Sequence, residues 1–286
     1  MTTVAAMTTD ELIAHILVLF TCRQDVYAEA YPDPNKPGKV RYVTRFEPVT
    51  RELILAHLKG ETPIGVYPMV EDHVAWAAVD FDAPTDTDGN PVDDPFVHAC
   101  DAGRAQQRAF EAAGLHSYLE RSRSGAGVHI WTFFDDMIPA ALVRAALRPL
   151  LTDHEIFVSR DRMFPVQDTT SKTTGGLGNL IALPYFGKAW ADGNSAMLDD
   201  AGVPVPPREW FLNVRKNAVA VIERLAEKAP KSQRPKAAPR ATPAARAEGD
   251  EWEASMVEAE PTFRPFPLLK GAMKLNDPRV LEFVRE

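Results

Sequence analysis

Cysteine is nearly absent from this sequence. Only Cys22 and Cys100 occur in 286 residues, far apart, and neither belongs to a CxxC pair. The sequence therefore excludes a disulfide framework and predicts no structural zinc site. A chain with so few thiols suits a reducing compartment, and we expect a cytoplasmic protein.

Long hydrophobic runs are also missing. The apolar stretch LIAHILVLF, at 12–20, is far shorter than the roughly 20 residues that a membrane-spanning helix needs. The first residues also lack the cationic segment, long apolar stretch and cleavage site of a signal peptide. We therefore expect no membrane partner and interpret 12–20 as part of a buried helix.

An excess of positive charge is the third absence. The formal net charge is −8, from 32 Lys and Arg against 40 Asp and Glu. This balance excludes a uniformly basic protein that coats nucleic acid, but it leaves room for a local basic groove. With 45% hydrophobic and 25% charged residues, the chain otherwise has the composition of a globular protein with a substantial core.

The composition changes near residue 229. Residues 229–262 are rich in Pro, Ala and charge and offer little to bury, so they predict a flexible linker. Apolar residues return in 263–286, which predicts a short C-terminal helical segment. We expect residues 1–228 to form the folded domain.

Helical and extended patterns alternate upstream of the linker. Strands are expected at 64–70 and 74–82, as neighbours joined by the turn 71–73. Mixed in this order, the elements predict an α+β fold in which helices back a largely antiparallel sheet. Helices are expected at 8–20, 50–60, 95–113 and 139–151, and further strands at 117–122, 128–134, 156–166 and 179–186.

Two carboxylates stand one residue apart at the end of the predicted strand 74–82. Side chains at i and i+2 of a strand point to the same side, so Asp80 and Asp82 converge while Val79 and Phe81 enter the other face. The two charges repel unless a proton or a cation relieves them, and Mg²⁺ and Mn²⁺ favour such oxygen ligands. The pattern fits a metal site, and it equally fits a strand end whose acids cap the following turn.

A glycine-containing turn lies within ERSRSGAGVHIW, at 120–131. Gly125 and Gly127 permit a tight turn with exposed backbone amides, which would suit an anion such as phosphate. The simpler interpretation is a plain hairpin, followed by a structural histidine on the face of Trp131. The candidate anion-binding residues are Arg121, Arg123, Ser124, Gly125 and His129.

A third stretch, 159–184, carries another acid and another glycine-rich loop. Asp161 lies between two arginines, so it is either a solvated, salt-bridged acid or a third carboxylate for a two-metal site. Lys172, in the loop that contains Gly175, Gly176 and Gly178, could contact phosphates, although a mobile hairpin loop explains the loop as well.

Together these stretches resemble a known family. In their order and spacing, 57–82, 120–131 and 160–184 are similar to the three signature motifs of the archaeo-eukaryotic primase superfamily. They are most similar to the primase-polymerase domains of bacterial TOTE conflict systems and CRISPR-associated primase-polymerases. The early stretch LFTCRQDVYAEAY, at 19–31, also resembles the N-terminal signature of that subgroup.

The resemblance implies a fold and a set of roles. It implies a catalytic domain over 1–228, in which an RNA-recognition-motif-like antiparallel sheet packs with an N-terminal α/β unit and the active site lies between them. Asp80, Asp82 and Asp161 are implied to be catalytic and to hold two divalent ions, Mg²⁺ or Mn²⁺. Ser124 and His129 are implied to contact the triphosphate of the incoming nucleotide. By charge and position, Arg121, Arg123 and Lys172 are further expected phosphate partners, as is Arg23.

The implied activity is nucleotidyl transfer on a single-stranded DNA template or primer, with NTP or dNTP as substrate. Relatives often carry a cysteine-rich zinc-binding insertion where this chain has the cysteine-free stretch 32–48, so its contacts are not expected here. No helicase module is recognised, and we expect a helicase or another replication or defence protein as a separate partner. A metal-dependent nuclease or phosphohydrolase and a noncatalytic nucleotide- or nucleic-acid-binding module are the alternatives.

Overall fold

Two antiparallel sheets organise the computed structural model, which describes residues 7–35, 40–82, 84, 92–152, 163–170 and 176–230. The larger sheet has the strand order β7-β4-β6-β5-β9. It is formed by β4 (His73–Phe81), β5 (Tyr118–Arg121), β6 (Val128–Pro139), β7 (Met163–Phe164) and β9 (Ala196–Met197), with α3 (Pro95–Ala112) and α4 (Ala140–Leu147) between its strands.

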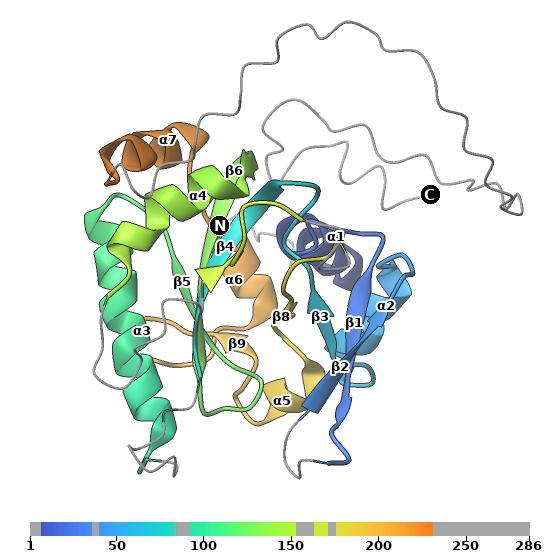
Figure 1. The fold of residues 1–286 in the computed structure, drawn as a ribbon. Coiled ribbons are helices and arrows are strands. Elements are labelled where there is room, and N and C mark those ends of the chain that lie inside the picture. The colour runs from blue at the N-terminus through green and yellow to red at the C-terminus, as the bar shows by residue number, and fades with distance from the viewer. Residues whose placement is uncertain are drawn as a thin grey trace, which may run out of the picture.

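The order of these elements along the chain and across the sheet identifies the fold type of the larger sheet. The succession β4-α3-β5-β6-α4-β7, folded with the spatial order β7-β4-β6-β5, is the β-α-β-β-α-β arrangement of ferredoxin-like and RNA-recognition-motif folds. In Figure 1, α3 and α4 lie on one side of this sheet and the smaller sheet lies on the other. The predicted α+β class and the RNA-recognition-motif-like sheet are confirmed.

The smaller sheet belongs to the N-terminal α/β unit and has the order β2-β1-β3-β8. Its last strand, β8, comes from far later in the chain, after four of the five strands of the larger sheet. Its elements are β1 (Tyr27–Pro32), β2 (Val40–Arg45), β3 (Ile64–Val66), β8 (Ile181–Ala182), α1 (Thr9–Phe20) and α2 (Arg51–Leu58). The remaining elements are the 3₁₀ turn η1 (Arg148–Leu150), α5 (Gly187–Ala191), α6 (Pro207–Asn213) and α7 (Val219–Lys228).

Local signals set the helix ends where the sequence predicts them. Thr8 and Glu11 form a reciprocal capping box at the start of α1, and the Thr50 hydroxyl accepts the backbone N–H of Leu53 at the start of α2. Gly114, with φ of +86°, follows the end of α3, in the left-handed region that glycine enters without a Cβ penalty.

One predicted pairing is wrong. The segments 64–70 and 74–82 were expected to be neighbouring strands, but β3 pairs with β1 and β8 in the smaller sheet, and β4 pairs with β6 and β7 in the larger one. Only an isolated bridge between Val70 and His73 joins the two segments. Pro68 has no N–H to donate to a ladder, which is consistent with the end of β3 at Val66.

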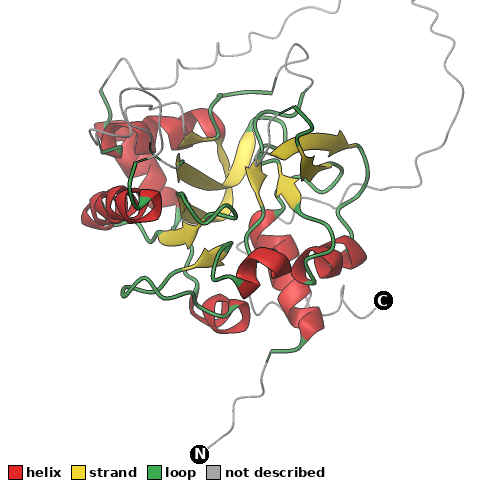
Figure 2. Cartoon of the chain, turned by 90° about the horizontal axis from the view of Figure 1, so that it is seen from below, coloured by secondary structure: helices red, strands yellow, loops and turns green. Residues whose placement is uncertain are grey.

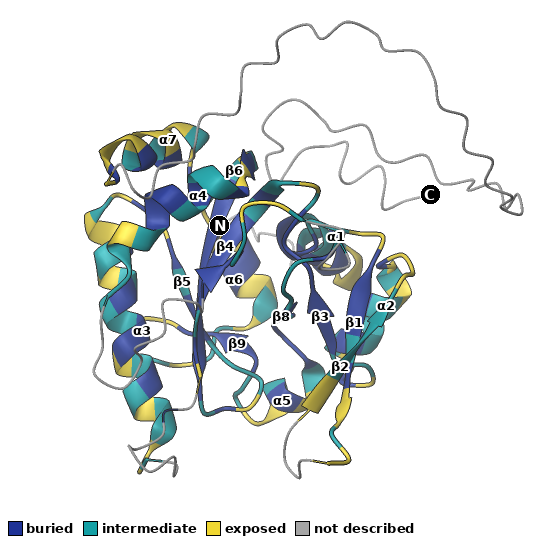
Figure 3. Ribbon diagram, viewed as in Figure 1, coloured by how far each residue is buried: buried dark blue, intermediate teal, exposed yellow. Residues whose placement is uncertain are grey.

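Alternate side chains of β4 and β6 enter two different cores. Trp76 and Trp131 pack with α1 and the smaller sheet, whereas Val79 and Ile130 pack with α3 and α4. The indole rings of Trp76 and Trp131 meet with centroids 4.9 Å apart, and Phe20 of α1 adds a third ring 5.1 Å from Trp131. Since both faces of the larger sheet are covered, its strands are mostly buried, whereas α3 also has exposed residues (Figure 3). Seen from below, the strands lie between two groups of helices (Figure 2).

Within the described residues, no helix has the length and apolar character needed to cross a bilayer. The last described helix, α7, ends at Lys228, next to the expected domain boundary. The predicted linker from residue 231 onward and the predicted helical segment 263–286 lie outside the described residues. The division of the chain into these three parts stays a prediction.

A buried histidine gives the N-terminal unit a pH-dependent stability. His57 of α2 accepts the backbone N–H of Ile64 at Nδ1 (3.3 Å) and donates from Nε2 to the Pro184 carbonyl (3.1 Å), which requires a neutral ring. Burial lowers its pKa from 6.5 to about 4. Below about pH 6.5, His57 is protonated in the unfolded chain but stays neutral in the folded chain. The free energy of unfolding should therefore fall by roughly 3 kcal/mol between pH 6.5 and 4.

Denaturant titrations of the parent and of His57→Gln over this pH interval test the point. The variant should be less stable at pH 7 and should lose most of this slope. A parent stability that stays level, or that shows the same slope as the variant, would contradict the role of His57.

Candidate active site

Three ionisable residues form a row across the larger sheet. Asp80 of β4 pairs with His129 of β6, and His129 pairs on its other side with Glu120 of β5. Directly paired residues on neighbouring strands point to the same face, so the three side chains lie side by side. They share the face that Trp131 presents to the smaller sheet.

Hydrogen bonds connect this row. Glu120 is 1% exposed, and its Oε2 accepts one bond from Nδ1 of His129 (2.9 Å) and another from Nε1 of Trp131 (2.6 Å). The other ring nitrogen of His129, Nε2, lies 3.6 Å from Oδ1 of Asp80. A buried carboxylate is costly without partners, and these two donors offset that cost for Glu120.

The charge of His129 follows from its neighbours. Burial alone would lower its pKa, but the carboxylate of Glu120, followed by the charges of Asp80 and Asp82, outweighs burial and raises the pKa to about 9. The imidazole is therefore positively charged at neutral pH. The side chains of His129 and Asp80 are 10% and 13% exposed, so the cation lies at the edge of the core.

Asp82 follows the end of β4 and is exposed. Gly127 makes room for the chain here, because a Cβ on it would lie 2.6 Å from the Phe81 carbonyl oxygen and 3.2 Å from Cα of Asp82. The hairpin between β5 and β6 is thereby held directly against the segment that carries the two aspartates.

The two aspartates fit a divalent cation. They are hard oxygen ligands two positions apart, and both act electrostatically on His129. Among the described residues, no group of three His, Cys, Asp or Glu has the arrangement of a metal site. The predicted third ligand, Asp161, lies outside the described residues, so the structure brings together two of the three expected ligands and does not test the third.

The turn at 122–127 uses its own amides. Gly125 donates to the Ser122 carbonyl (3.0 Å), and Ala126 and Gly127 donate to the hydroxyls of Ser124 (3.4 Å) and Ser122 (3.2 Å). The expectation of exposed amides at Gly125 and Gly127 is therefore wrong, because the turn closes on itself. The exposed residue that it presents is Ser124.

Two arginines of the hairpin point to different sides. Arg121 lies over the Phe96 ring of α3, 3.9 Å from its centroid, and its Nε donates to the Gly125 carbonyl (3.0 Å). Arg123 lies instead over Tyr42 of the smaller sheet, 5.6 Å from its centroid. In the part of the chain that the structure describes, its buried Nη1 has no hydrogen-bond partner.

Tyr42 interacts both with Arg123 and with the carboxylates of the ionisable row. Burial raises the pKa of Tyr42, Arg123 lowers it, and the charges of Glu120 and Asp80 raise it further. Arg123 therefore reaches from the hairpin to Tyr42 of the smaller sheet, and the charges of Glu120 and Asp80 act on the same tyrosine. An unsatisfied guanidinium N–H at this position is suited to an anionic ligand.

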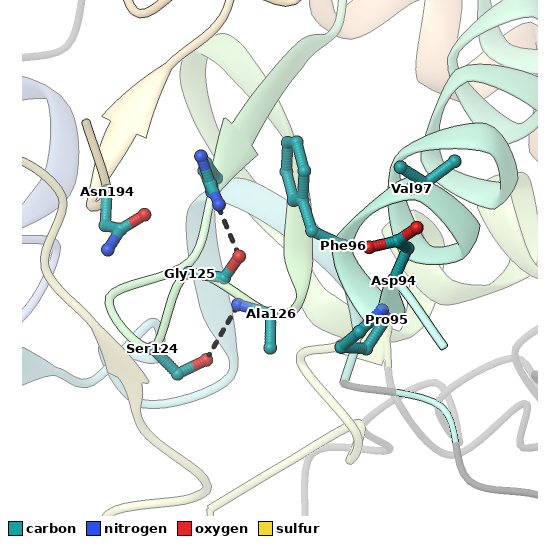
Figure 4. Close-up of a pocket in the computed structure, with 9 residues that line it drawn as sticks. Asp94, Pro95, Phe96, Val97, Ser124, Gly125, Ala126 and Asn194 are labelled. Carbon is teal, nitrogen blue, oxygen red and sulfur yellow. Dashed lines mark hydrogen bonds between the residues drawn. The ribbon is translucent and has the colours of Figure 1, made fainter. Parts of the chain in front are cut away.

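A cavity of about 400 Å³ opens on the outer side of the turn, against the start of α3. Figure 4 shows Ser124 and Asn194 on one side of it and Phe96 and Asp94 on the other. The buried Oδ1 of Asn194 has no hydrogen-bond partner among the described residues. The turn thus has a hollow outer side as well as a side that faces the aspartates.

The remaining predicted residues are placed only in part. Arg23 donates from Nη1 to the Gly176 carbonyl (2.7 Å) and forms an ion pair with Asp25 (2.7 Å). It thus ties the N-terminal unit to the glycine-rich loop. Lys172 and Gly175, in the same loop, lie outside the described residues.

Sequence reasoning missed Glu120 and Tyr42. Glu120 stands within the quoted motif, and alternation along 118–121 could have placed it opposite Leu119, but its pairing with His129 depends on the hairpin register. Tyr42 reaches the site from the other sheet, and no local signal in the sequence marks it.

Comparisons with known proteins identify the family of this chain. Residues 11–225 match the family described as the archaeo-eukaryotic primase domain of TOTE conflict systems. The chain is therefore an archaeo-eukaryotic primase domain. Within that class it belongs to the TOTE conflict system family, as the motifs predict.

Among solved structures, the polymerase domain of ligase D from Mycobacterium tuberculosis, in complex with DNA, is similar to this chain. The two share 13% identity, the match covers 78% of this chain and 94% of that domain, and the TM-score is 0.35. No curated protein matches the sequence.

The close approach of Gly127 to β4 predicts a defined effect of substitution. Gly127→Ala should displace the end of β4 and move Asp82, because the neighbouring atoms are backbone and cannot turn aside. We expect the affinity for Mn²⁺, measured by electron paramagnetic resonance of the free ion, to fall at least ~10-fold.

The matched control is Gly202→Ala, which meets nothing within 4 Å but places a side chain at φ of +82°. It should cost roughly 1–2 kcal/mol of stability and leave the Mn²⁺ affinity unchanged. Equal Mn²⁺ affinities for the parent and Gly127→Ala would show that the glycine does not position Asp82.

Proposed function

We propose that the protein is a nucleotidyltransferase, a DNA primase or polymerase that extends a 3′-hydroxyl or starts a primer on single-stranded DNA. The observation that carries the proposal is the row of Asp80, His129 and Glu120, with Asp82 beside it, in a chain of the archaeo-eukaryotic primase family. The row joins carboxylates suited to metal ions to a cation suited to a triphosphate.

In this proposal, the 3′-hydroxyl oxygen bonds to the α-phosphorus of an NTP or dNTP, and pyrophosphate leaves. Asp80, Asp82 and Asp161 would hold two Mg²⁺ or Mn²⁺ ions. Bound there, the ions would lower the pKa of the 3′-hydroxyl and stabilise the charge on the leaving pyrophosphate. Asp161 is included because the family resemblance assigns it as the third ligand, and the strand that follows it, β7, pairs with β4.

The positive side chains would bind the triphosphate. The neighbouring carboxylates favour the charged form of His129, and the buried Nη1 of Arg123 has no hydrogen-bond partner among the described residues. Ser124 would add a hydroxyl from the exposed tip of the turn, and Lys172 is proposed as a further phosphate contact. Such groups, fixed before the reaction, stabilise charge at little reorganisation cost. Arg121 packs on Phe96, and we propose that it supports the turn's shape.

The acidic net charge fits a DNA-binding protein if the basic contacts are confined to one surface. Binding to the template should then weaken steeply as salt rises. A helicase or another replication or defence protein is our proposed partner, and the cytoplasm our proposed location.

Primer extension tests the assignment directly. The parent, Asp80→Asn and Asp82→Asn are incubated with a primed single-stranded template, Mg²⁺ or Mn²⁺, and either dNTPs or NTPs. We expect metal-dependent growth by the parent and a loss of at least ~100-fold in both variants, because an amide binds a divalent ion more weakly than a carboxylate. The control Asp200→Asn removes an equal charge at an exposed position and should extend like the parent.

Each alternative activity has its own outcome in this assay. Shortening of the DNA without triphosphates would identify a nuclease. Triphosphate binding without turnover, unaffected by Asp80→Asn, would identify a noncatalytic binding module. Parent-like extension by Asp82→Asn would end the proposal.

A separate prediction concerns Asp161. If it shares the ions with Asp80, Asp161→Asn should lose as much activity as Asp80→Asn, and the double variant should be little worse than either single one. The measurement is single-turnover extension by the three proteins. Losses that multiply in the double variant would place Asp161 outside the metal site.

A further inference from the structure

We propose that Glu120 is a positioning residue, whose carboxylate fixes the ring of His129 so that Nε2 is directed toward Asp80 and toward the nucleotide. The inference rests on the proposed function for the identity of the ligand. It rests on the geometry of the sheet for the orientation of the ring.

The carboxylate holds the histidine at one defined nitrogen. Oε2 of Glu120 lies 2.9 Å from Nδ1 of His129, and a carboxylate can only accept, so Nδ1 carries the proton of this bond. Nε2 is then the nitrogen left to face Asp80, 3.6 Å away. A ring rotated by half a turn about its Cβ–Cγ bond would lose the bond to Glu120.

Trp131 holds the carboxylate in turn. Its Nε1 donates to the same Oε2 over 2.6 Å, and its ring is packed between Trp76 and Phe133. The indole is fully buried and cannot easily move. Glu120 thus connects a rigid aromatic cluster to the one histidine of the row.

A purely structural role does not require a carboxylate here. If only the Trp131 N–H needed a partner, a neutral amide or hydroxyl would satisfy it without the desolvation cost of a buried charge. Glu120 is only 1% exposed, yet this core position carries a carboxylate. The second group that donates to it is His129, which lies next to Asp80. The charge therefore acts on His129.

Two variants separate positioning from packing. Glu120→Gln keeps the size of the side chain and an oxygen that can accept from Trp131, but it removes the charge and lets an amide NH₂ compete for the pocket. Trp131→Phe keeps the bond between Glu120 and His129, but it removes the indole donor and loosens the packing of the aromatic cluster. We expect Glu120→Gln to raise the KM for the nucleoside triphosphate ~10- to 100-fold with a smaller change in kcat, and Trp131→Phe to change KM less than ~3-fold.

The orientation of the ring is measured without any nucleotide or metal. In protein labelled with ¹⁵N-histidine, the Nδ1 proton of His129 should give a slowly exchanging, downfield nuclear magnetic resonance signal. The signal should persist in Trp131→Phe and be lost or shifted upfield in Glu120→Gln. Its absence from the folded parent would overturn the proposal, even if neither variant folds.

The kinetic and spectroscopic results test the proposed function and the role of Glu120 separately. A parent that shows the Nδ1 signal but neither binds triphosphate nor extends primers would refute the proposed function and leave the orienting role standing. A parent that extends primers, with equal KM values for itself and Glu120→Gln, would refute the positioning role alone. Equal rises in KM for Glu120→Gln and Trp131→Phe would show that the effect comes from packing.

Discussion

The site depends on an alternation of charge across three hydrogen-bonded strands. His129 stands between Glu120 and Asp80, so a cation separates two carboxylates that would otherwise repel each other in a poorly solvated place. A shift of either strand by one residue would turn its ionisable side chain into the helix-facing core. Because that core is apolar, the same constraint that fixes the fold also fixes the site.

The two faces of the larger sheet have different roles, one in stability and the other in the site. The face toward α3 and α4 is lined by aliphatic residues such as Val79, Val128 and Ile130, and it supplies hydrophobic stabilisation. The opposite face begins with the aromatic cluster around Trp131 and ends with the ionisable row. Packing on α1 anchors one end of β4 and β6, so the other end can carry charged groups that do not contribute to the core.

Much of the fold could be predicted because its signals are local. The cap at Thr8, the glycine after α3 and the alternation along β4 each act within a few residues. The pairing of β3 could not be predicted in this way. Its partners are β1 and β8, one of them far later in the chain, and a short polar connection to β4 looks the same whether it joins a hairpin or two sheets.

The site shows the same limit and one more. Asp80 and His129 stand out as residue types, whereas the importance of Glu120 comes from its partners. Two arginines grouped by their charge are separated by the end of the strand: Arg121, the last residue of β5, packs on Phe96, whereas Arg123, in the turn, reaches Tyr42. The internal hydrogen bonds of the turn keep this separation, because they fix the backbone from which both side chains start. Because the amides of the closed turn bond within the turn, they are not available as ligands, but the turn becomes a rigid support for side chains. For a site that must hold charge at a fixed distance from Asp80, rigid support is more important than free amides.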